Sequence, residues 1–226
     1  MSMEQMLHYL AALEQNNDRD WFHTHRQEYD QARTAFEKLV EDLLCELRRS
    51  DPSLPVLPAR ELTFKLMRDT RFSRDKSPYL PAFRAHLGPR GKLPVPVGYY
   101  LMVRPGGRSF LGGGLFADMF RDATTRVRDA IAANGEEWAA ILADPVFAGT
   151  FTVGGSALKR VPQGYDPAHP QAEWLRCKSW YLELPVPDSR LLEPGFLPWV
   201  AEAFQRMQPF NDFLNRALEG FELPAR

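Results

Sequence analysis

Apolar residues near the N-terminus recur every three or four positions, the spacing that places them on one face of an α-helix. One such series covers residues 3–13, and another covers residues 21–49. Between them, Asn16, Asn17 and Asp18 are residues that favour helix ends and helix caps. The pattern therefore predicts a first helix, a tight turn and a long amphipathic helix that ends near Arg49.

The pattern then changes to one that is typical of strands and loops. Three prolines predict an irregular connection over residues 51–58, and apolar side chains alternate along residues 62–67 as they do in a strand with one covered face. Residues 78–96 are rich in Pro, Gly and basic side chains and predict a long surface loop. Residues 97–103 and 109–111 predict a hairpin, which Gly112, Gly113 and Gly114 would end.

The C-terminal half predicts mainly helices. Helical spacing begins at Phe116, the Asn134-Gly135 pair would close that helix, and residues 136–143 continue as another. A strand pattern follows through Val153, then a short helix over residues 169–175, a strand over residues 179–184 and a helical region over residues 196–218 that Pro209 would interrupt. The apolar positions of the first of these helices are Phe116, Met119, Phe120, Ala123, Val127, Ala130 and Ile131.

Together these elements predict an α+β fold, in which a mostly antiparallel mixed sheet packs against several helices, including the long N-terminal one. The chain has 226 residues, 44% of them hydrophobic, which suits one large domain. We expect residues 1–226 to form a single domain because no flexible linker interrupts them. Neither a signal peptide nor a membrane span is expected, since the N-terminus has no continuous apolar run, and we expect a cytoplasmic protein.

Charge is distributed unevenly along the chain. Residues 60–108 contain eleven Lys or Arg and three acidic residues, a net charge of +8, whereas the rest has 17 basic and 26 acidic residues, net −9. Such a concentration in a protein of overall charge −1 indicates an anionic partner, a phosphate or a carboxylate, near the basic segment.

The densest part of this segment runs from Arg68 to Tyr79. Phe72 would anchor it in the core, and Arg71 would present its guanidinium to two anionic oxygens. The acidic candidates are Asp69 and Asp75, which would orient these cations or, if burial raised a pKa, act as a general base. The full set of ligand-binding candidates in this block is Arg68, Arg71, Ser73, Lys76 and Tyr79. The alternative is a structural Arg/Asp network that holds an irregular loop.

A second basic block follows much later in the chain. Lys159, Arg160 and Lys178 are further candidates for an anion, and the neighbouring prolines would hold His169 in one orientation for proton transfer. A turn residue is the alternative for His169. If the two blocks meet in space, they would line a basic cleft.

Several other functions lack their motifs. The chain has no Gly-x-Ser-x-Gly elbow, His-Glu-x-x-His helix or Cys-x-x-Cys pair, and the triple glycine lacks the Lys-Ser/Thr ending of a phosphate-binding loop. His23 and His25 lie two residues apart, which disfavours a metal pair on a helix. Cys45 and Cys177 are predicted to be reduced and packed. We therefore predict no metal and no cofactor.

Six separated motifs resemble the bacterial family called domain of unknown function 2461. The resemblance covers nearly the whole chain and implies a single cytosolic domain, without an established activity to carry over. The chain departs from the family pattern at Leu80, where a lysine commonly follows Pro-Tyr. The motifs are residues 16–22, residues 68–79, residues 98–100, the triple glycine at 112–114, residues 158–165 and residues 175–178.

The leading hypothesis from the sequence is a domain that binds an anionic, phosphorylated small molecule in a basic cleft, with metal-independent acid/base chemistry as an option. One alternative is a non-enzymatic protein-interaction module, whose Arg/Asp network is structural. A second alternative is nucleic-acid binding, in which cations follow the backbone and exposed aromatic rings stack on bases.

Overall fold

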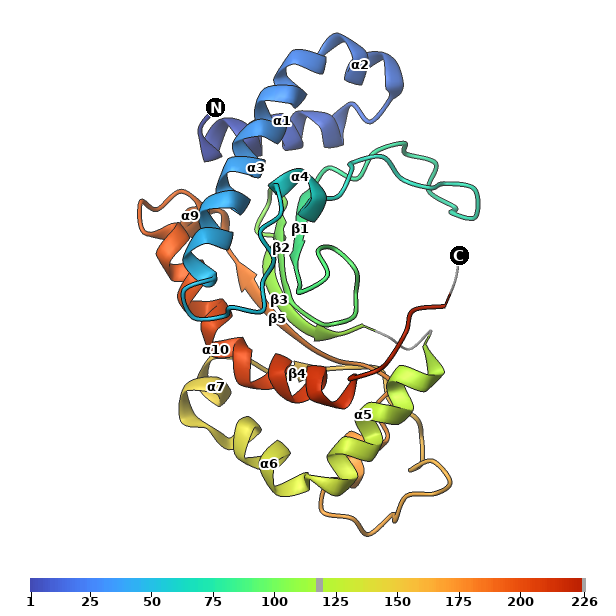
Figure 1. Ribbon diagram of the computed structural model, residues 1–226. Coiled ribbons are helices and arrows are strands. Elements are labelled where there is room, and N and C mark those ends of the chain that lie inside the picture. Colours follow the sequence, from blue (N-terminus) through green and yellow to red (C-terminus); the bar gives the residue numbers. More distant parts are fainter. Residues whose placement is uncertain (117–119, 225–226) are drawn as a thin grey trace.

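A computed structural model describes residues 1–116 and 120–224, and its centre is a curved antiparallel sheet (Figure 1). The strand order is β1-β2-β3-β5-β4, and every neighbouring pair is antiparallel. The strands are β1 (Phe83–Leu87), β2 (Tyr99–Val103), β3 (Ser109–Leu115), β4 (Val153–Gly154) and β5 (Trp180–Val186). With the helices around it, the sheet confirms the predicted α+β fold.

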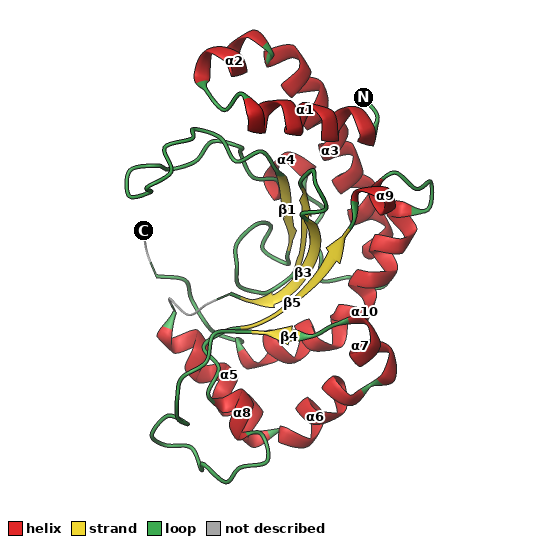
Figure 2. Cartoon of the chain, turned by 180° about the vertical axis from the view of Figure 1, so that it is seen from behind, coloured by secondary structure: helices red, strands yellow, loops and turns green. Residues whose placement is uncertain are grey.

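The helices of the described chain surround the sheet on one side and at both ends (Figure 2). The longest are α3 and α10, which contact strands β1 and β3 respectively. In chain order the helices are α1 (Met3–Gln15), α2 (Arg19–Thr24), α3 (Arg26–Leu47), α4 (Ala59–Leu62), α5 (Arg121–Ala133), α6 (Gly135–Ala143), α7 (Pro145–Thr150), α8 (Ala172–Leu175), α9 (Asp188–Leu191) and α10 (Phe196–Ala217). Within the described ranges, no helix is long and apolar enough to cross a membrane.

The N-terminal helices form as their sequence predicts, with one difference. Ser2 and Gln5 cap α1 reciprocally, and Asp18 accepts a hydrogen bond of 2.8 Å from the backbone N–H of Trp21 at the start of α2. The long helix predicted for residues 21–49 is divided, because the backbone leaves helical geometry at His25 (φ −104°, ψ 23°). Two helices, α2 and α3, therefore share the predicted apolar face.

The two faces of the sheet differ in what covers them. Leu101, Leu111 and Leu182 point to the side of α3 and α10 and are fully buried. The opposite face is concave and, in Figures 1 and 2, has no helix lying across it. Side chains alternate between the faces along each strand, so the residues between these leucines line the concave side.

Two predicted features of the strands are wrong. The region predicted as a long loop contains β1, in which the buried Phe83, Ala85 and Leu87 face the core and alternate with Arg84 and His86. Residues 62–67, predicted as a strand, begin inside α4 and form only single bridges, at residues 63 and 67. Single bridges do not form a continuous ladder, so residues 62–67 are not a strand. The strand of this region is β1, further along the chain.

The triple glycine lies inside β3 instead of ending it. Glycine is required at Gly114 (φ +84°), because a side chain there would meet the carbonyl oxygen of Trp180 on the neighbouring strand. At Gly113 an added Cβ would lie 3.1 Å from the sulfur of Met207 on α10. Close approach of backbone and helix, not termination, explains these residues.

Helix predictions in the C-terminal half also need correction. Pro209 does not interrupt α10, because buried residues on both sides of it, Met207 and Phe210 among them, pack into the same core. The predicted strand before Val153 is the short helix α7, and β4 has only two residues. The helix expected from Phe116 begins at Arg121; Met119, part of that prediction, lies outside the described residues.

The cysteines are both free, as predicted, but they differ in environment. Cys177 is buried, and burial raises the pKa of its thiol. Cys45 is exposed on α3, which corrects the prediction that both are packed. Its position on the helix, one residue after the buried Leu44, turns it toward solvent.

Candidate functional site

A cavity of about 350 Å³ opens on the concave face of the sheet. Strands β1, β2, β3 and β5 supply its floor, and the loop between β1 and β2 forms one side, curling over the concave face in Figure 1. Its lining is mostly apolar, with a few polar groups, as in many small-molecule sites. The lining residues are Phe64, His86, Lys92, Pro94, Gly98, Tyr100, Phe110, Gly113, Gly114, Phe116 and Glu183.

Strand register explains why these side chains meet. His86 lies opposite Tyr100, Tyr100 opposite Gly112, and Gly112 opposite Glu183, so the four form one row across the sheet. Neighbouring strands are about 4.8 Å apart. Tyr100 and Glu183 lie two strand spacings apart, about 10 Å, and Gly112, which has no side chain, lies between them. The ring of Phe110 leans over Gly112, 3.4 Å from where a Cβ would be.

Aromatic rings form two walls of the cavity. On one side Tyr100 stacks on Phe110 with ring centroids 5.5 Å apart, and Phe64 packs at 6.3 Å from Tyr100. On the other side Phe116 stacks on Tyr181 at 4.1 Å, with an angle of 16° between the planes. Aromatic rings at a cavity wall favour a ligand with a flat, apolar group.

His86 is the most buried polar side chain in the cavity wall. Its Nδ1 lies 3.1 Å from the carbonyl oxygen of Gly91, so Nδ1 carries the proton and donates it. Burial lowers the pKa of His86 to about 4. At neutral pH the ring is therefore uncharged, and Nε2, which has no hydrogen-bond partner in the described part of the chain, is an acceptor.

The charged groups of the cavity are placed at its edges. Lys92 donates from Nζ to the carbonyl oxygen of Thr63 at 3.3 Å and remains exposed. Glu183 is also exposed and forms no ion pair with any described residue. Behind the aromatic wall, the Arg84 guanidinium lies 5.3 Å from the Phe64 ring centre and partly offsets the rise that burial causes in the pKa of Tyr100. A ligand would meet a cation on one side and a carboxylate on the other.

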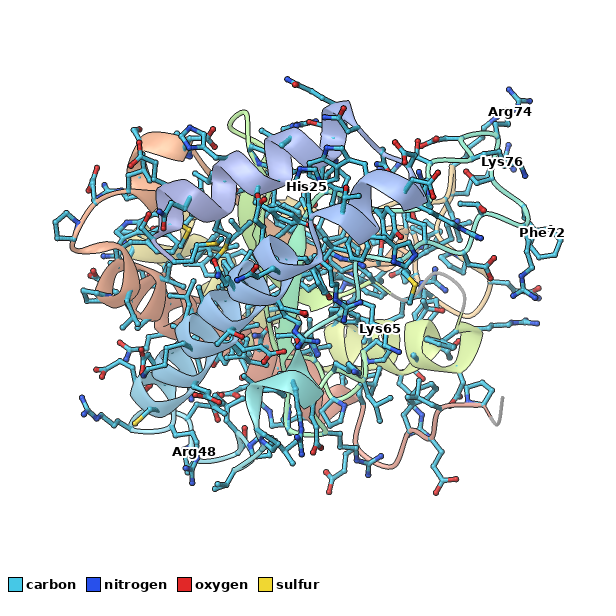
Figure 3. All side chains as sticks on the ribbon, turned by 90° about the horizontal axis from the view of Figure 1, so that it is seen from above. His25, Arg48, Lys65, Phe72, Arg74 and Lys76 are labelled. Carbon is cyan, nitrogen blue, oxygen red and sulfur yellow. The ribbon has the colours of Figure 1, made fainter. Side chains whose placement is uncertain are left out.

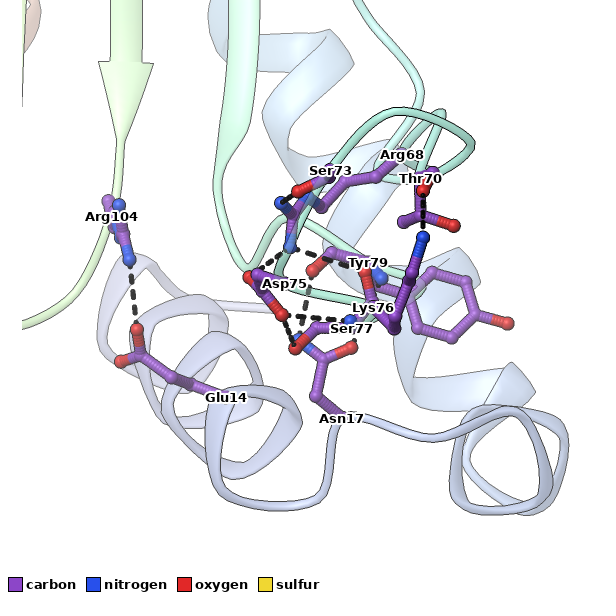
Figure 4. Close-up of polar contacts among 10 residues, drawn as sticks. All are labelled: Glu14, Asn17, Arg68, Thr70, Ser73, Asp75, Lys76, Ser77, Tyr79 and Arg104. Atoms are coloured by element: carbon purple, nitrogen blue, oxygen red, sulfur yellow. Dashed lines mark hydrogen bonds and ion pairs between the residues drawn. The ribbon is translucent and has the colours of Figure 1, made fainter.

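The first block of predicted site residues forms a separate projection. Residues 68–78 leave the domain at an antiparallel bridge between Met67 and Tyr79 and extend away from it in Figure 1; we call them the arm, and Figure 4 shows its polar contacts. Asn17 fixes the base of the arm, because its side chain donates to the Tyr79 carbonyl at 2.9 Å and accepts from the Tyr79 N–H at 3.1 Å. Tyr79 itself is buried and stacks on Phe22 at 4.2 Å, so its ring belongs to the core.

Within the arm, arginines and aspartates pair with one another. Arg68 forms an ion pair with Asp75 and lies 3.4 Å from the hydroxyl of Ser73. Asp75 also accepts from the backbone N–H of Ser77 at 2.9 Å, and these contacts hold the pKa of its carboxyl well below the usual range. Asp75 is therefore ionised at neutral pH and already paired. This arrangement fits a structural role for Asp75 better than a role as general base.

The outer half of the arm is exposed. Arg71 and Asp69 form an ion pair at 2.6 Å, with most of both side chains in solvent, and the pair lowers the pKa of Asp69. Lys76 donates from Nζ to the carbonyl oxygen of Thr70 at 2.9 Å. Phe72 does not anchor the arm, contrary to the prediction, because its side chain is 95% exposed. Arg68 and the Asn17–Tyr79 contacts hold the arm instead.

The second predicted block lies at the other end of the molecule. Figures 1 and 2 place residues 156–170 beside α5 and α8, across the concave face from the arm, so the structure does not bring the two blocks together. Lys159 and Arg160 are exposed beside a shallow depression, and the backbone N–H of Lys178 donates to Ser156.

Both ring nitrogens of His169 contact the backbone. Its Nδ1 accepts from the N–H of Gln171 at 2.9 Å, and its Nε2 lies 3.1 Å from the carbonyl oxygen of Ala132. The proton is therefore on Nε2. This histidine joins the loop to α5, and a catalytic role would require it to exchange one of these contacts.

The cavity residues were not predicted from the sequence. His86 and Lys92 lie in the segment predicted as a loop, and Glu183 was treated only as part of a strand. The alternation of Phe83, Ala85 and Leu87 with polar residues was the available indication that His86 faces the opposite side from the core. Among the described residues, no group of three or more His, Cys, Asp or Glu side chains is arranged to hold a metal ion.

The structure defines an α+β domain with an aromatic-walled cavity on the open face of its sheet. A family model described as "Conserved hypothetical protein (DUF2461)" matches residues 5–213, and the chain belongs to that family. This confirms the resemblance of the sequence motifs. Neither the curated proteins nor the solved structures contain a match to the chain.

Proposed function

We propose that the cavity on the open sheet face binds a small molecule with a flat ring and an anionic group, such as a nucleotide. The observation that carries this proposal is the cavity of about 350 Å³, whose lining combines stacked aromatic rings with the polar side chains of His86, Lys92 and Glu183. A planar ring against Phe110 and Phe116, both of which line the cavity, would bury apolar surface without needing new charged partners.

The polar groups determine which ring fits. Neutral His86 accepts a hydrogen bond through Nε2, and the Glu183 carboxylate accepts one from the other side. Both favour a ring that carries N–H donors at its edge. Lys92 supplies the cation for a phosphate or carboxylate, and the basic segment of residues 60–108 provides a wider attractive field.

The site supports binding more than acid/base catalysis. A group with a pKa of about 4 is a weak base at neutral pH, whereas general bases work best with pKa values near the pH of the reaction. Asp75, one of the two candidate general bases in the arm, is kept ionised by its contacts with Ser77 and Arg68. We therefore assign His86 the role of a hydrogen-bond acceptor toward the ligand.

The test is a thermal-shift screen with nucleotides and aromatic carboxylates, compared with sugar phosphates and polyphosphate, which have the charge but not the ring. A ligand that binds only the native state stabilises it by about 2.7 kcal/mol at a hundred times its Kd, and this raises the melting temperature. We expect a shift with the planar anions only. Similar shifts with sugar phosphates would contradict the role of the aromatic walls.

Two variants assign the shift to the cavity. Lys92→Ala removes the cation, and His86→Asn keeps a donor near the position of Nδ1 while removing the Nε2 acceptor. Each should reduce affinity for the planar anion about tenfold, the effect of about 1.4 kcal/mol. Arg48→Ala, an exposed arginine at the end of α3, is the matched control and should bind as the wild type does. Unchanged affinity in both cavity variants would overturn the proposal.

A further inference from the structure

The arm presents one bare aromatic ring and several cations outside the cavity. Figure 3 shows Phe72, Arg74 and Lys76 projecting together from one side of the molecule. The Phe72 ring is 95% exposed, the highest value among the large hydrophobic side chains of the described chain. Single exposed apolar side chains are common and do not by themselves indicate a binding surface. The cations around this ring are therefore the second observation that points to a partner.

The negative charges of the arm are already neutralised. Asp69 pairs with Arg71, and Asp75 pairs with Arg68. Arg74 makes no hydrogen bond or ion pair with any described residue, and Lys76 contacts only a backbone carbonyl oxygen. The arm therefore has a net charge of +2 in residues 68–78, and the uncompensated charges, Arg74 and Lys76, lie at the same edge of the molecule as the ring (Figure 3).

The arm is also shaped before any partner binds. Its base is held by the backbone hydrogen bonds from Arg68 to Pro78 at 2.9 Å and from Leu80 to Leu66 at 2.8 Å. The tip is a turn in which the N–H of Ser73 donates to the Thr70 carbonyl at 3.2 Å. A fixed turn that keeps Phe72 outward lowers the entropy cost of using that ring for binding.

We propose that the arm binds a single-stranded nucleic acid, in which one base stacks on Phe72 and neighbouring phosphates contact Arg74 and Lys76. A single strand offers both a flat base and a negatively charged backbone, the two features that the arm complements. The Arg71 guanidinium lies over the Phe72 ring, 5.9 Å from its centre, and adds a cation beside the stacking site. In a duplex the base faces are covered by stacking, so only the cations would find a partner.

Fluorescence anisotropy with labelled uridine and thymidine 12-mers, at low and moderate salt, tests this on the full chain. We expect binding that weakens with salt, as phosphate contacts require. Phe72→Ala should weaken it by about fivefold or more, the range for loss of one stacked base. Arg74→Ala should weaken binding and reduce the salt slope by about 0.7 for its phosphate contact. Preference for one 12-mer identifies the strand as RNA or DNA.

Matched controls place the binding on the arm. Val56→Ala truncates another side chain that is 77% exposed, and Arg48→Ala removes an exposed cation on the opposite side in Figure 3; neither should change affinity. Because Phe72 is exposed, Phe72→Ala should keep the wild-type melting temperature. The proposal is overturned by absence of binding to both 12-mers or by wild-type affinity in Phe72→Ala.

Discussion

Asn211 and Asn215 lie one turn apart on α10, and both side chains bind the backbone that enters β2. Asn215 accepts from the N–H of Val97 at 2.8 Å and donates to the carbonyl of the same residue at 3.1 Å. Asn211 donates to the Gly98 carbonyl at 3.2 Å and accepts from the Gly114 N–H at 2.9 Å. Gly98 and Gly114 line the cavity. A helix on the covered side of the sheet therefore positions the floor of the site on the open side.

Asn211→Ala should lower the free energy of unfolding by about 1–3 kcal/mol, because it leaves a buried donor and a buried acceptor without this partner. Urea denaturation measures the effect. Gln205→Ala, on the exposed side of the same helix, is the control and should change stability by less than about 0.5 kcal/mol. Equal effects of the two substitutions would show that the Asn211 contacts add nothing.

His86 should make the fold sensitive to mild acid. The pKa of His86 is about 4 in the folded protein, whereas an ordinary histidine, as in the unfolded chain, has a pKa of 6.5. Between these pH values the unfolded chain therefore binds a proton at this position and the folded chain does not. Protonation then favours unfolding. The contribution of neutral His86 to the free energy of unfolding is fully present above pH 6.5, and it should fall by about 3 kcal/mol as the pH is lowered to 4.

Denaturation curves between pH 4 and 7 for the wild type and His86→Asn test this dependence. The variant has no titrating ring at this position, so its stability should fall less steeply in that range, by up to about 1.4 kcal/mol per pH unit. Identical slopes for the two proteins would mean that His86 is protonated as readily in the folded state as in the unfolded state.

Tyr99 and Asp51 form a buried contact on the covered side of the sheet. The Tyr99 hydroxyl donates to Asp51 Oδ2 at 2.8 Å, while Oδ1 accepts from the hydroxyl and N–H of Ser53. Tyr99→Phe removes one donor from a buried carboxylate and should cost about 1–3 kcal/mol. The matched control is Tyr181→Phe, since the hydroxyl of Tyr181 has no hydrogen bond to any described residue. Guanidinium denaturation should separate the two variants.

The two arginines of the arm should differ in their structural roles. Arg68 is half-buried and contacts Asp75, Ser73 and the carbonyl of Ser77, whereas Arg71 is exposed and pairs with Asp69 inside the outer half of the arm. Arg68→Ala should therefore loosen the arm, and Arg71→Ala should not. Limited chymotrypsin digestion reports this through cleavage after Phe72, which both variants retain. We expect several-fold faster cleavage in Arg68→Ala and wild-type cleavage in Arg71→Ala.

The prediction of the fold was most accurate where local patterns were long. The helices near the N-terminus, the hairpin of β2 and β3 and the C-terminal helix follow from apolar spacing that tertiary packing preserves. Short elements were harder to predict. In β1 the alternation of Phe83, Ala85 and Leu87 was hidden among basic and proline-rich neighbours, and α7 occupies a segment whose apolar residues suit a strand as well.

The candidate site could be predicted only in part. The dense charge of residues 68–76 left two interpretations open, an anion site and a structural Arg/Asp network, and the arm contains two such Arg/Asp pairs. It did not indicate that Phe72 points outward, because exposure depends on what the rest of the chain leaves uncovered. His86, Tyr100 and Glu183 are distant in the sequence, and each is unremarkable in its own segment.

The sequence by itself determined the α+β class, the family and the basic segment, because these depend on composition, motif order and local periodicity. Only the tertiary structure decided which side chains share a site. Strand pairing places His86, Tyr100, Gly112 and Glu183 in one row, and a shift of one residue in any strand would turn its member to the other face. Register results from the packing of the whole sheet against α3 and α10, so no single segment contains it.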